Sequence, residues 1–308
     1  MAASIELSEA EILAEEQSRD TNHMDEIIVN WYPGHMVSAL RMMTEQLKVC
    51  DVIIYMLDAR CAMSCLNPNF DSMVMRKPVL FVLNKSDLAP AGVKQEFLST
   101  PAVQKIYKQK PGQVETITLN SGQTGEGKKA VSAVMRILSE RLETARNKGI
   151  TKTIRAIVIG VTNCGKSTFI NNLAKKGKTV TGDKPGVTKQ KQWVTAGDNF
   201  NILDTPGTLW PQGTNQIVLR NLAYVGSIKD DILDAVLLTK TLIRDLEILQ
   251  PGLVTARYGS SNFEEICKKR GYLLKGGILD IERCAKAILV EFRAGSIGKY
   301  NLDKLGKI

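Results

Sequence analysis

A glycine-rich segment near the middle of the chain has residue types that hold phosphate groups. The stretch Gly160 to Ser167 reads G-x-x-x-x-G-K-S and directly follows the apolar run 157–159. Glycines at this spacing let successive backbone N–H groups point at phosphate oxygens, while the lysine reaches the outer phosphates and the serine hydroxyl holds Mg²⁺. A glycine turn with a solvated lysine is the alternative. We predict a nucleotide site that includes Asn163, Cys164, Gly165, Lys166, Ser167 and Thr168.

A second motif, N-K-S-D at 84–87, predicts that the base of this nucleotide is guanine. It follows the apolar run 78–83. The Asp87 carboxylate can accept hydrogen bonds from both N1–H and the 2-amino group of guanine, which adenine does not offer. The Asn84 amide is expected to contact the O6/N7 edge, and the Lys85 stem to cover a ring face. Ser121 and Gly122, after the run 114–119, are expected to form a third base-contacting loop.

A third motif supplies groups for a metal ion and a terminal phosphate. Asp204-Thr205-Pro206-Gly207 follows the predicted strand 200–203. Asp204 can bind Mg²⁺ through water, and the Gly207 N–H can contact a γ-phosphate. Thr188, at the end of Pro185-Gly186-Val187-Thr188, is placed like a threonine that completes the Mg²⁺ shell when a triphosphate is bound. Ser167 is the third predicted Mg²⁺ ligand.

The elements that position these motifs alternate between apolar runs and helical patterns. We expect strands at 52–57, 78–83, 114–119, 157–159, up to Trp193, and 200–203. We expect helices at 36–47, 125–143, 168–175, 228–249, 263–270 and 280–292. This alternation predicts an α/β fold, a doubly wound and mostly parallel sheet, followed by a small all-α domain.

The charge distribution favours a polyanionic partner. The 308 residues have a formal charge of +9, yet residues 1–26 carry eight acids against one base, Arg19. Removing the −7 of this segment leaves +16 on the rest of the chain, which favours RNA binding by counterion release. A merely solubilising surface is the alternative. The acidic start argues against a mitochondrial transit peptide.

The cysteines and the hydropathy exclude other classes. Six cysteines form no C-x-x-C pair and only two histidines occur, so we expect neither a disulfide framework nor a zinc site and favour a reducing compartment. No apolar run reaches membrane-spanning length. We therefore expect a protein without a membrane span.

The order of the motifs is permuted relative to most GTPases. N-K-S-D precedes the G-x-x-x-x-G-K-S segment, which precedes Thr188 and Asp204 to Gly207. With Trp31 to Met36, this order resembles the YlqF/RbgA family of circularly permuted GTPases. Further matching segments are Asp58-Ala59-Arg60, Asn67-Pro68 and Gly226-Ser227-Ile228-Lys229-Asp230-Asp231. The resemblance covers the chain from about residue 27.

The resemblance implies a GTPase that assists late assembly of the large ribosomal subunit, with GTP and GDP as ligands. The sequence divides into an acidic extension at 1–26, a permuted GTPase domain at 27–212 and a helical domain at 213–308, and the resemblance implies that the helical domain binds ribosomal RNA. Bases of that helical domain are the expected phosphate contacts: Lys268, Lys269, Arg270, Lys275, Arg283, Lys286 and Arg293. A solvated face is the alternative for these bases. We expect a cytoplasmic monomer.

The resemblance also assigns catalytic roles. Thr208 stands where many GTPases have a water-orienting glutamine, and the resemblance gives that role to His35. It implies that Asn163 helps to bind K⁺, that Lys166, Thr188 and Gly207 complete the catalytic set, and that hydrolysis is slow until ribosomal subunits stimulate it. Departures from the family pattern include Thr162 in place of a usual proline. The competing hypothesis is a guanine-nucleotide-gated RNA-binding module with incidental hydrolysis.

Overall fold

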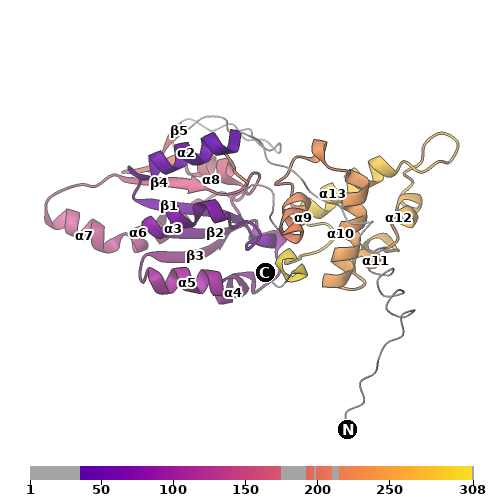
Figure 1. The fold of residues 1–308 in the computed structure, drawn as a ribbon, viewed down its shortest axis with the longest axis horizontal. Coiled ribbons are helices and arrows are strands. Elements are labelled where there is room, and N and C mark those ends of the chain that lie inside the picture. Colours follow the sequence, from indigo (N-terminus) through magenta and orange to yellow (C-terminus); the bar gives the residue numbers. More distant parts are fainter. Residues whose placement is uncertain (1–34, 175–191, 198, 210–214, 307–308) are drawn as a thin grey trace, which may run out of the picture. The chain divides into compact units, whose positions relative to one another are not determined.

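The computed structural model describes residues 35–174, 192–197, 199–209 and 215–306, and these form two compact units (Figure 1). Leu233–Leu289 belongs to the helical unit. The described parts of Asn30–Ile232 and Val290–Ile308 belong to the sheet unit. The units are defined by contacts, and the functional domains 1–26, 27–212 and 213–308 stay a prediction.

The sheet unit is built on six strands in the order β3-β2-β1-β4-β6-β5. All neighbours pair in parallel except β5 and β6, which are antiparallel. The strands are β1 (Val52–Asp58), β2 (Val79–Asn84), β3 (Val114–Leu119), β4 (Ile154–Ile159), β5 (Gln192–Gly197) and β6 (Phe200–Asp204). This arrangement confirms the predicted mostly parallel sheet.

The central strands are buried along their whole length. Every residue of β1 and β2 is buried, as their continuous apolar runs predict for parallel strands covered on both faces. The register pairs Asp58 with Asn84, so both strands end level with each other. After β3 the chain returns to the other side of β1 and adds β4 there. Ligand sites of open parallel sheets lie at the carboxyl ends of strands around such a reversal.

Three helices of the sheet unit were predicted: those at 36–47 and 168–175 are found within two residues of these bounds, the one at 125–143 is corrected, and four further helices were not predicted. The helix predicted over 125–143 is two helices, α6 (Gly127–Ile137) and α7 (Ser139–Asn147). The buried face of α6 includes Ala130, Ala133 and Val134, whereas α7 buries no residue, so the chain turns where packing ends. The other helices are α2 (His35–Leu47), α3 (Asp71–Arg76), α4 (Val93–Ser99), α5 (Pro101–Gln109), α8 (Lys166–Leu173) and α9 (Gln216–Tyr224).

The helical unit contains α10 (Ala235–Leu249), α11 (Leu253–Tyr258), α12 (Phe263–Lys269) and most of α13 (Ile281–Arg293). The helix predicted to begin at Ile228 begins at Ala235 instead. The Asp234 side chain accepts hydrogen bonds from Val236 N and Leu237 N, which caps the helix there. Within the described part of this unit, extended pairing is limited to the isolated bridge between Leu273 and Leu279.

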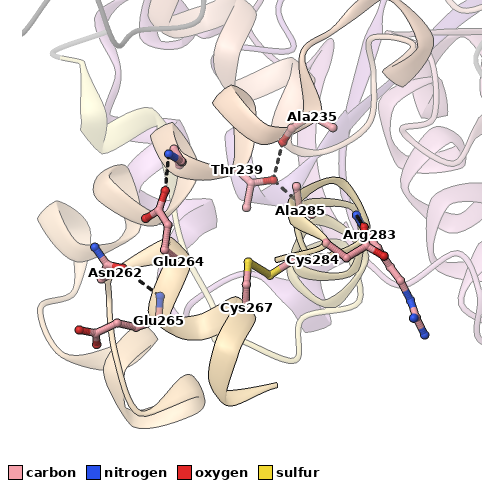
Figure 2. Close-up of a disulfide and its surroundings, with 11 residues drawn as sticks. Ala235, Thr239, Asn262, Glu264, Glu265, Cys267, Arg283, Cys284 and Ala285 are labelled. Atoms are coloured by element: carbon pink, nitrogen blue, oxygen red, sulfur yellow. Dashed lines mark hydrogen bonds and ion pairs between the residues drawn. A yellow bond between two sulfur atoms is a disulfide. The ribbon is translucent and has the colours of Figure 1, made fainter. Parts of the chain in front are cut away.

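A disulfide joins Cys267 of α12 to Cys284 of α13 (Figure 2). The expectation that the cysteines form no disulfide framework missed this bridge, because the two residues are 17 positions apart and meet only when the helices pack. Thr239 of α10 donates to the Ala285 carbonyl at 3.2 Å and so joins α10 to α13. The other four cysteines are free and buried.

The last residues of the chain pack within the sheet unit. The Asp303 carboxylate accepts from Met63 N at 2.7 Å and from Ser64 N at 3.0 Å. Lys304 forms an ion pair with Glu96 at 2.8 Å. Residues 290–306 are therefore an integral part of the unit that carries the predicted nucleotide site.

Candidate nucleotide-binding site

The loop between β4 and α8 has the conformation that its sequence predicts. Gly165 has φ +99° and directly precedes α8, whose first residue is Lys166. The Lys166 ammonium is buried and donates to the carbonyl oxygens of Gly160 at 3.1 Å and Val161 at 2.7 Å. These carbonyls hold the ammonium inside the loop where the outer phosphates of a nucleotide are expected.

Ser167 and Asp204 lie together beside this loop, as a Mg²⁺ site requires. The Ser167 hydroxyl is 3.3 Å from Asp204 Oδ2, while Asp204 Oδ1 is buried and has no hydrogen-bond partner among the residues that the structure describes. Burial raises the pKa of the Asp204 carboxyl, against the opposing effects of Lys166 and Ser167. A buried carboxylate oxygen without a partner, next to a serine hydroxyl, fits a hard cation that takes oxygen ligands.

Gly207 lies directly against the phosphate loop. A Cβ atom at Gly207 would be 2.6 Å from Thr162 Cα and 2.7 Å from Thr162 N, so no larger residue fits without moving the backbone. The Thr208 N–H donates to the Gly160 carbonyl at 3.3 Å. The backbone of the Asp204–Gly207 motif is thereby held next to the residues expected to surround the phosphates.

Asn84 joins the base-binding motif to the phosphate loop. Its side chain is fully buried; Nδ2 donates to Cys164 O at 2.8 Å and to Ser121 Oγ at 2.9 Å. Its Oδ1 accepts from Ser121 N at 2.8 Å. The predicted contact of this amide with guanine stays a prediction, because both amide hydrogens are used to hold the two loops together.

The same Asn84 amide lies so close to Gly165 that it leaves no room for a side chain there. A Cβ atom at Gly165 would lie 2.2 Å from Asn84 Nδ2 and 3.1 Å from Ser121 Oγ. The positive φ of Gly165 adds a second requirement for glycine. The second glycine of the phosphate loop is therefore also the point where the base-binding loops touch it.

Lys85 is held by a buried ion-pair cluster at the end of β1. Its ammonium is 3.0 Å from Asp58 Oδ2 and donates to the Asn163 carbonyl at 2.8 Å. Asp58 is also bound by Arg60, whose Nε and Nη2 donate to its two oxygens at 2.9 and 2.8 Å. Although burial alone would raise the pKa of Asp58, the charges of Arg60 and Lys85 hold that pKa well below its usual range.

The remaining predicted base contacts lie on more accessible backbone. Asp87 is exposed in the short turn Ser86–Leu88, and its carboxylate is accessible to solvent and to a ligand. The Gly122 N–H donates to Asn120 Oδ1 at 2.9 Å, which shapes the loop after β3. Asn172 of α8 donates to the Ser121 carbonyl and so ties that loop to the helix that follows the phosphate loop.

Two predicted catalytic residues are not placed by the structure. His35 is the first residue of α2, at the predicted turn-to-helix junction, but its side chain lies outside the described residues. Thr188 lies outside them entirely. The roles predicted for both stay predictions.

Several residues of the site were given no role in the sequence analysis. Asp58 and Arg60 follow a buried strand, and that position was the signal available for them. Thr162 exchanges hydrogen bonds with Ser227: its hydroxyl donates to the Ser227 carbonyl, and Ser227 Oγ donates to the Thr162 carbonyl at 2.8 Å. A proline at 162 has no hydroxyl to make the first of these bonds, so the departure from the family pattern adds a contact here.

The structure corrects the prediction for one basic residue that was expected to contact RNA. Arg293 lies in the sheet unit, and its guanidinium is bound by Asp230 at 2.7 Å and by two backbone carbonyls. It is therefore not an open phosphate-binding side chain. The other predicted bases, Lys268, Lys269, Arg270, Lys275, Arg283 and Lys286, are exposed in the helical unit. Figure 2 shows Arg283 pointing away from the disulfide.

The fold and the site define a P-loop GTPase whose base-binding motif precedes its phosphate loop in the chain. The family of 50S ribosome-binding GTPases matches residues 155–250. Ribosome biogenesis GTPase A of Bacillus cereus is 37% identical, with 90% of this chain and 94% of the relative covered. Mitochondrial ribosome-associated GTPase 1 of Bos taurus is 28% identical, with 90% and 89% covered.

A solved structure shares the fold. The crystal structure of GNP-bound YlqF from T. maritima superposes with a TM-score of 0.58 and covers 85% of this chain and 95% of its own, at 24% identity. The chain belongs to the ribosome biogenesis GTPase A (YlqF/RbgA) family. Membership makes it a GTP-hydrolysing enzyme and does not favour the alternative of a binding module with incidental hydrolysis. No helix among the described residues is both long and apolar enough to cross a bilayer.

Proposed function

We propose that this GTPase assists assembly of the large ribosomal subunit, and that its nucleotide state controls its affinity for pre-ribosomal RNA. The observation that carries the proposal is the 37% identity to a ribosome biogenesis GTPase over 90% of the chain. A site in which the base loops and the phosphate loop are bonded to each other supports it. The charge of +16 outside residues 1–26 fits a polyanionic partner.

In this proposal the phosphate side of the site binds and orients GTP. Lys166 leaves its backbone carbonyls to contact the outer phosphates, and the Gly207 N–H donates to the γ-phosphate. Ser167, Asp204 and Thr188 are the residues that would hold Mg²⁺, either directly or through water. The ion would neutralise charge on the β- and γ-phosphate oxygens as the bond between them breaks.

Asp87 provides guanine specificity, and Asn84, Ser121 and Gly122 hold the loops that surround the base. Lys85 covers one ring face with its stem while its ammonium stays bonded to Asp58 and Asn163. Because these bonds exist in the protein alone, little ordering entropy is lost when the base binds.

For hydrolysis, we propose that His35 orients the attacking water and that the Asn163 side chain is a ligand of K⁺. The Asn163 Nδ2 donates to the Gly226 carbonyl at 2.8 Å, so the nitrogen end of the amide faces the Gly226 loop. The amide oxygen is the end that would bind K⁺. A K⁺ ion near the β- and γ-phosphates would supply the charge that an arginine supplies in other GTPases. Turnover is slow until ribosomal subunits bind.

The helical unit would contact ribosomal RNA through its exposed bases. Lys268, Lys269 and Arg270 end α12, and Lys286 lies on α13. Lysine and arginine contacts to phosphates make binding fall with increasing salt, with a slope set by the number of contacts. We expect the protein to act as a cytoplasmic monomer.

The test is GTP turnover with and without large ribosomal subunits, in K⁺ and in Na⁺, by the wild type, His35→Ala and His23→Ala. His23 is the only other histidine of the chain and serves as the matched control. We expect subunits and K⁺ together to raise wild-type and His23→Ala turnover strongly, while His35→Ala binds GTP and stays slow. Turnover that ignores subunits, K⁺ and His35 would contradict the proposal.

A further inference from the structure

Arg293, the last residue of α13, bridges two segments of the sheet unit. Its Nε and Nη2 donate to the carbonyls of Tyr224 and Ala223, both at 3.0 Å, at the carboxyl end of α9. Its Nη1 and Nη2 bind the Asp230 carboxylate, both at 2.7 Å. A guanidinium suits this task because its planar fork serves a carboxylate and two carbonyls at once. Arg293 therefore fixes both ends of the loop 225–229.

That loop is bonded to the phosphate loop. The Gly226 carbonyl accepts from Asn163 Nδ2 at 2.8 Å, and Ser227 exchanges two hydrogen bonds with Thr162. Gly226 also lies against the Arg293 guanidinium, since a Cβ atom there would be 3.2 Å from Nε. Arg293 consequently reaches the side chain of Asn163 through one intervening loop.

A second chain of contacts leads from Arg293 to the main chain of the same asparagine. The Arg293 carbonyl accepts from Arg60 Nη1 at 3.2 Å. Arg60 binds Asp58, and Asp58 binds Lys85 at 3.0 Å. Lys85 donates to the Asn163 carbonyl at 2.8 Å. The two chains of contacts close a ring in which Asn163 and Arg293 lie on opposite sides.

These contacts hold Asn163 in one backbone conformation. Its φ of +55° is left-handed, a region that asparagine tolerates better than most residues other than glycine but that still costs free energy, so bonds to neighbouring residues favour it. The ring holds its carbonyl from the Lys85 side and its amide from the Gly226 side. Both bonds fix a residue in the middle of the phosphate loop.

We propose that Arg293 is a positioning residue for nucleotide binding, and that it acts on the phosphate loop through Asn163. Arg293 does not touch the nucleotide in this account. Loss of its side chain releases the loop 225–229, whereas Arg60 donates to the main-chain carbonyl of residue 293, which an alanine keeps. The left-handed turn at Asn163 is then held from the Lys85 side alone. Nucleotides then bind to a phosphate loop that must first be ordered, and affinity falls with it.

The test measures the affinity of a fluorescent GDP analogue for Arg293→Ala, Asn163→Ala, the double variant and the control Lys304→Ala. Lys304 lies in the same C-terminal segment and forms one ion pair, with Glu96, outside the ring. We expect Arg293→Ala to weaken binding about tenfold and Lys304→Ala to weaken it less than twofold. In the double variant, the loss should stay within about twofold of that in Asn163→Ala alone, because Arg293 acts through Asn163.

Additive losses in the double variant, or equal losses in Arg293→Ala and Lys304→Ala, would overturn the proposal and leave Arg293 a general structural contact. If Arg293→Ala does not fold, Asp230→Asn removes the charge partner from a half-exposed position, and a loss of about threefold with the same non-additivity is expected. All measurements are made without ribosomal subunits. Their outcome is therefore independent of the proposed role in ribosome assembly.

Discussion

The site has a base side, formed by Asn84, Lys85 and Ser121, and a phosphate side, formed by Lys166, Ser167 and Asp204. The two sides differ in how many of their polar groups already have partners within the protein. On the base side, Asn84 uses both amide hydrogens and its oxygen, and Asp58 is bound by two cations. On the phosphate side, Asp204 has a buried oxygen without a partner in the described part of the chain, and burial is the chief cause of its raised pKa. The base side is therefore preorganised, whereas the phosphate side is completed by the charges of nucleotide and metal.

The largest effect on stability is expected for Asp58→Asn. The change leaves Arg60 and Lys85 buried or half-buried without their shared countercharge, which costs about 4 kcal/mol in the free energy of unfolding at pH 7. Urea denaturation of the nucleotide-free protein measures it. A loss below about 1 kcal/mol would show that the base side does not depend on this ion-pair cluster.

The effect of Asp58→Asn on the free energy of unfolding should also depend on pH. A lowered folded-state pKa means that Asp58 stabilises the protein above its unfolded pKa of about 4, and that this contribution is lost as the pH falls toward the folded value. The difference between wild type and Asp58→Asn should therefore shrink below about pH 4. A difference that is constant down to the acid transition would contradict the assignment.

Asn84→Ala is expected to lower the free energy of unfolding by about 3 kcal/mol, because Ser121 N and Cys164 O lose their buried partner. Asn147→Ala, at the exposed end of α7, is the matched control and should change stability by less than about 0.5 kcal/mol. Denaturation of the nucleotide-free proteins compares the two. Equal stabilities would mean that Asn84 serves only the ligand.

Lys166→Ala should show the opposite behaviour, a large effect on binding and a small one on stability. Loss of the charged hydrogen bonds to phosphate is expected to weaken GDP binding ~100-fold. The nucleotide-free protein should unfold at nearly the same urea concentration as the wild type, because relief from burying the ammonium offsets the loss of its bonds to the Gly160 and Val161 carbonyls. Calorimetric titration and denaturation of one preparation give both values, and a strongly destabilised protein would contradict the contrast between the two sides.

The smallest effect is expected for Asp204→Asn, and it has the opposite sign. Because burial raises the pKa of Asp204, its ionised form is disfavoured in the folded protein, and stability is reduced once the pH exceeds the folded value. The neutral amide should raise the free energy of unfolding by about 1 kcal/mol at pH 7 without Mg²⁺. GTP binding by this variant should no longer depend on Mg²⁺. A lower free energy of unfolding than that of the wild type would contradict the interpretation that the Asp204 carboxylate is unsatisfied.

The two central strands could be predicted because the continuous apolar runs 52–57 and 78–83 identify buried parallel strands. The run 114–119 was predicted with the bounds of β3, and the motif order identified the permutation. The break at Leu138 and the start of α10 were missed because both depend on where packing ends and on the cap at Asp234. Local periodicity does not contain this information.

The site was predictable where one motif carries the chemistry and not where distant residues meet. Lys166, Ser167 and Asp204 lie together as expected from their motifs. The contact of Arg60 with the Arg293 carbonyl joins positions 233 residues apart, and no local pattern indicates it. The same limit applies to the pairing of Cys267 with Cys284.

The difference between the two sides is tested most directly by hydrogen exchange of individual amides, without nucleotide and with Mg²⁺ and GDP. We predict that Ser121 N–H, already bonded to Asn84, is protected without nucleotide and that its protection changes little when GDP binds. The N–H groups of Gly165 and Lys166 should gain strong protection. Fast exchange at Ser121 without nucleotide, followed by protection equal to that of the phosphate loop, would contradict a preorganised base side.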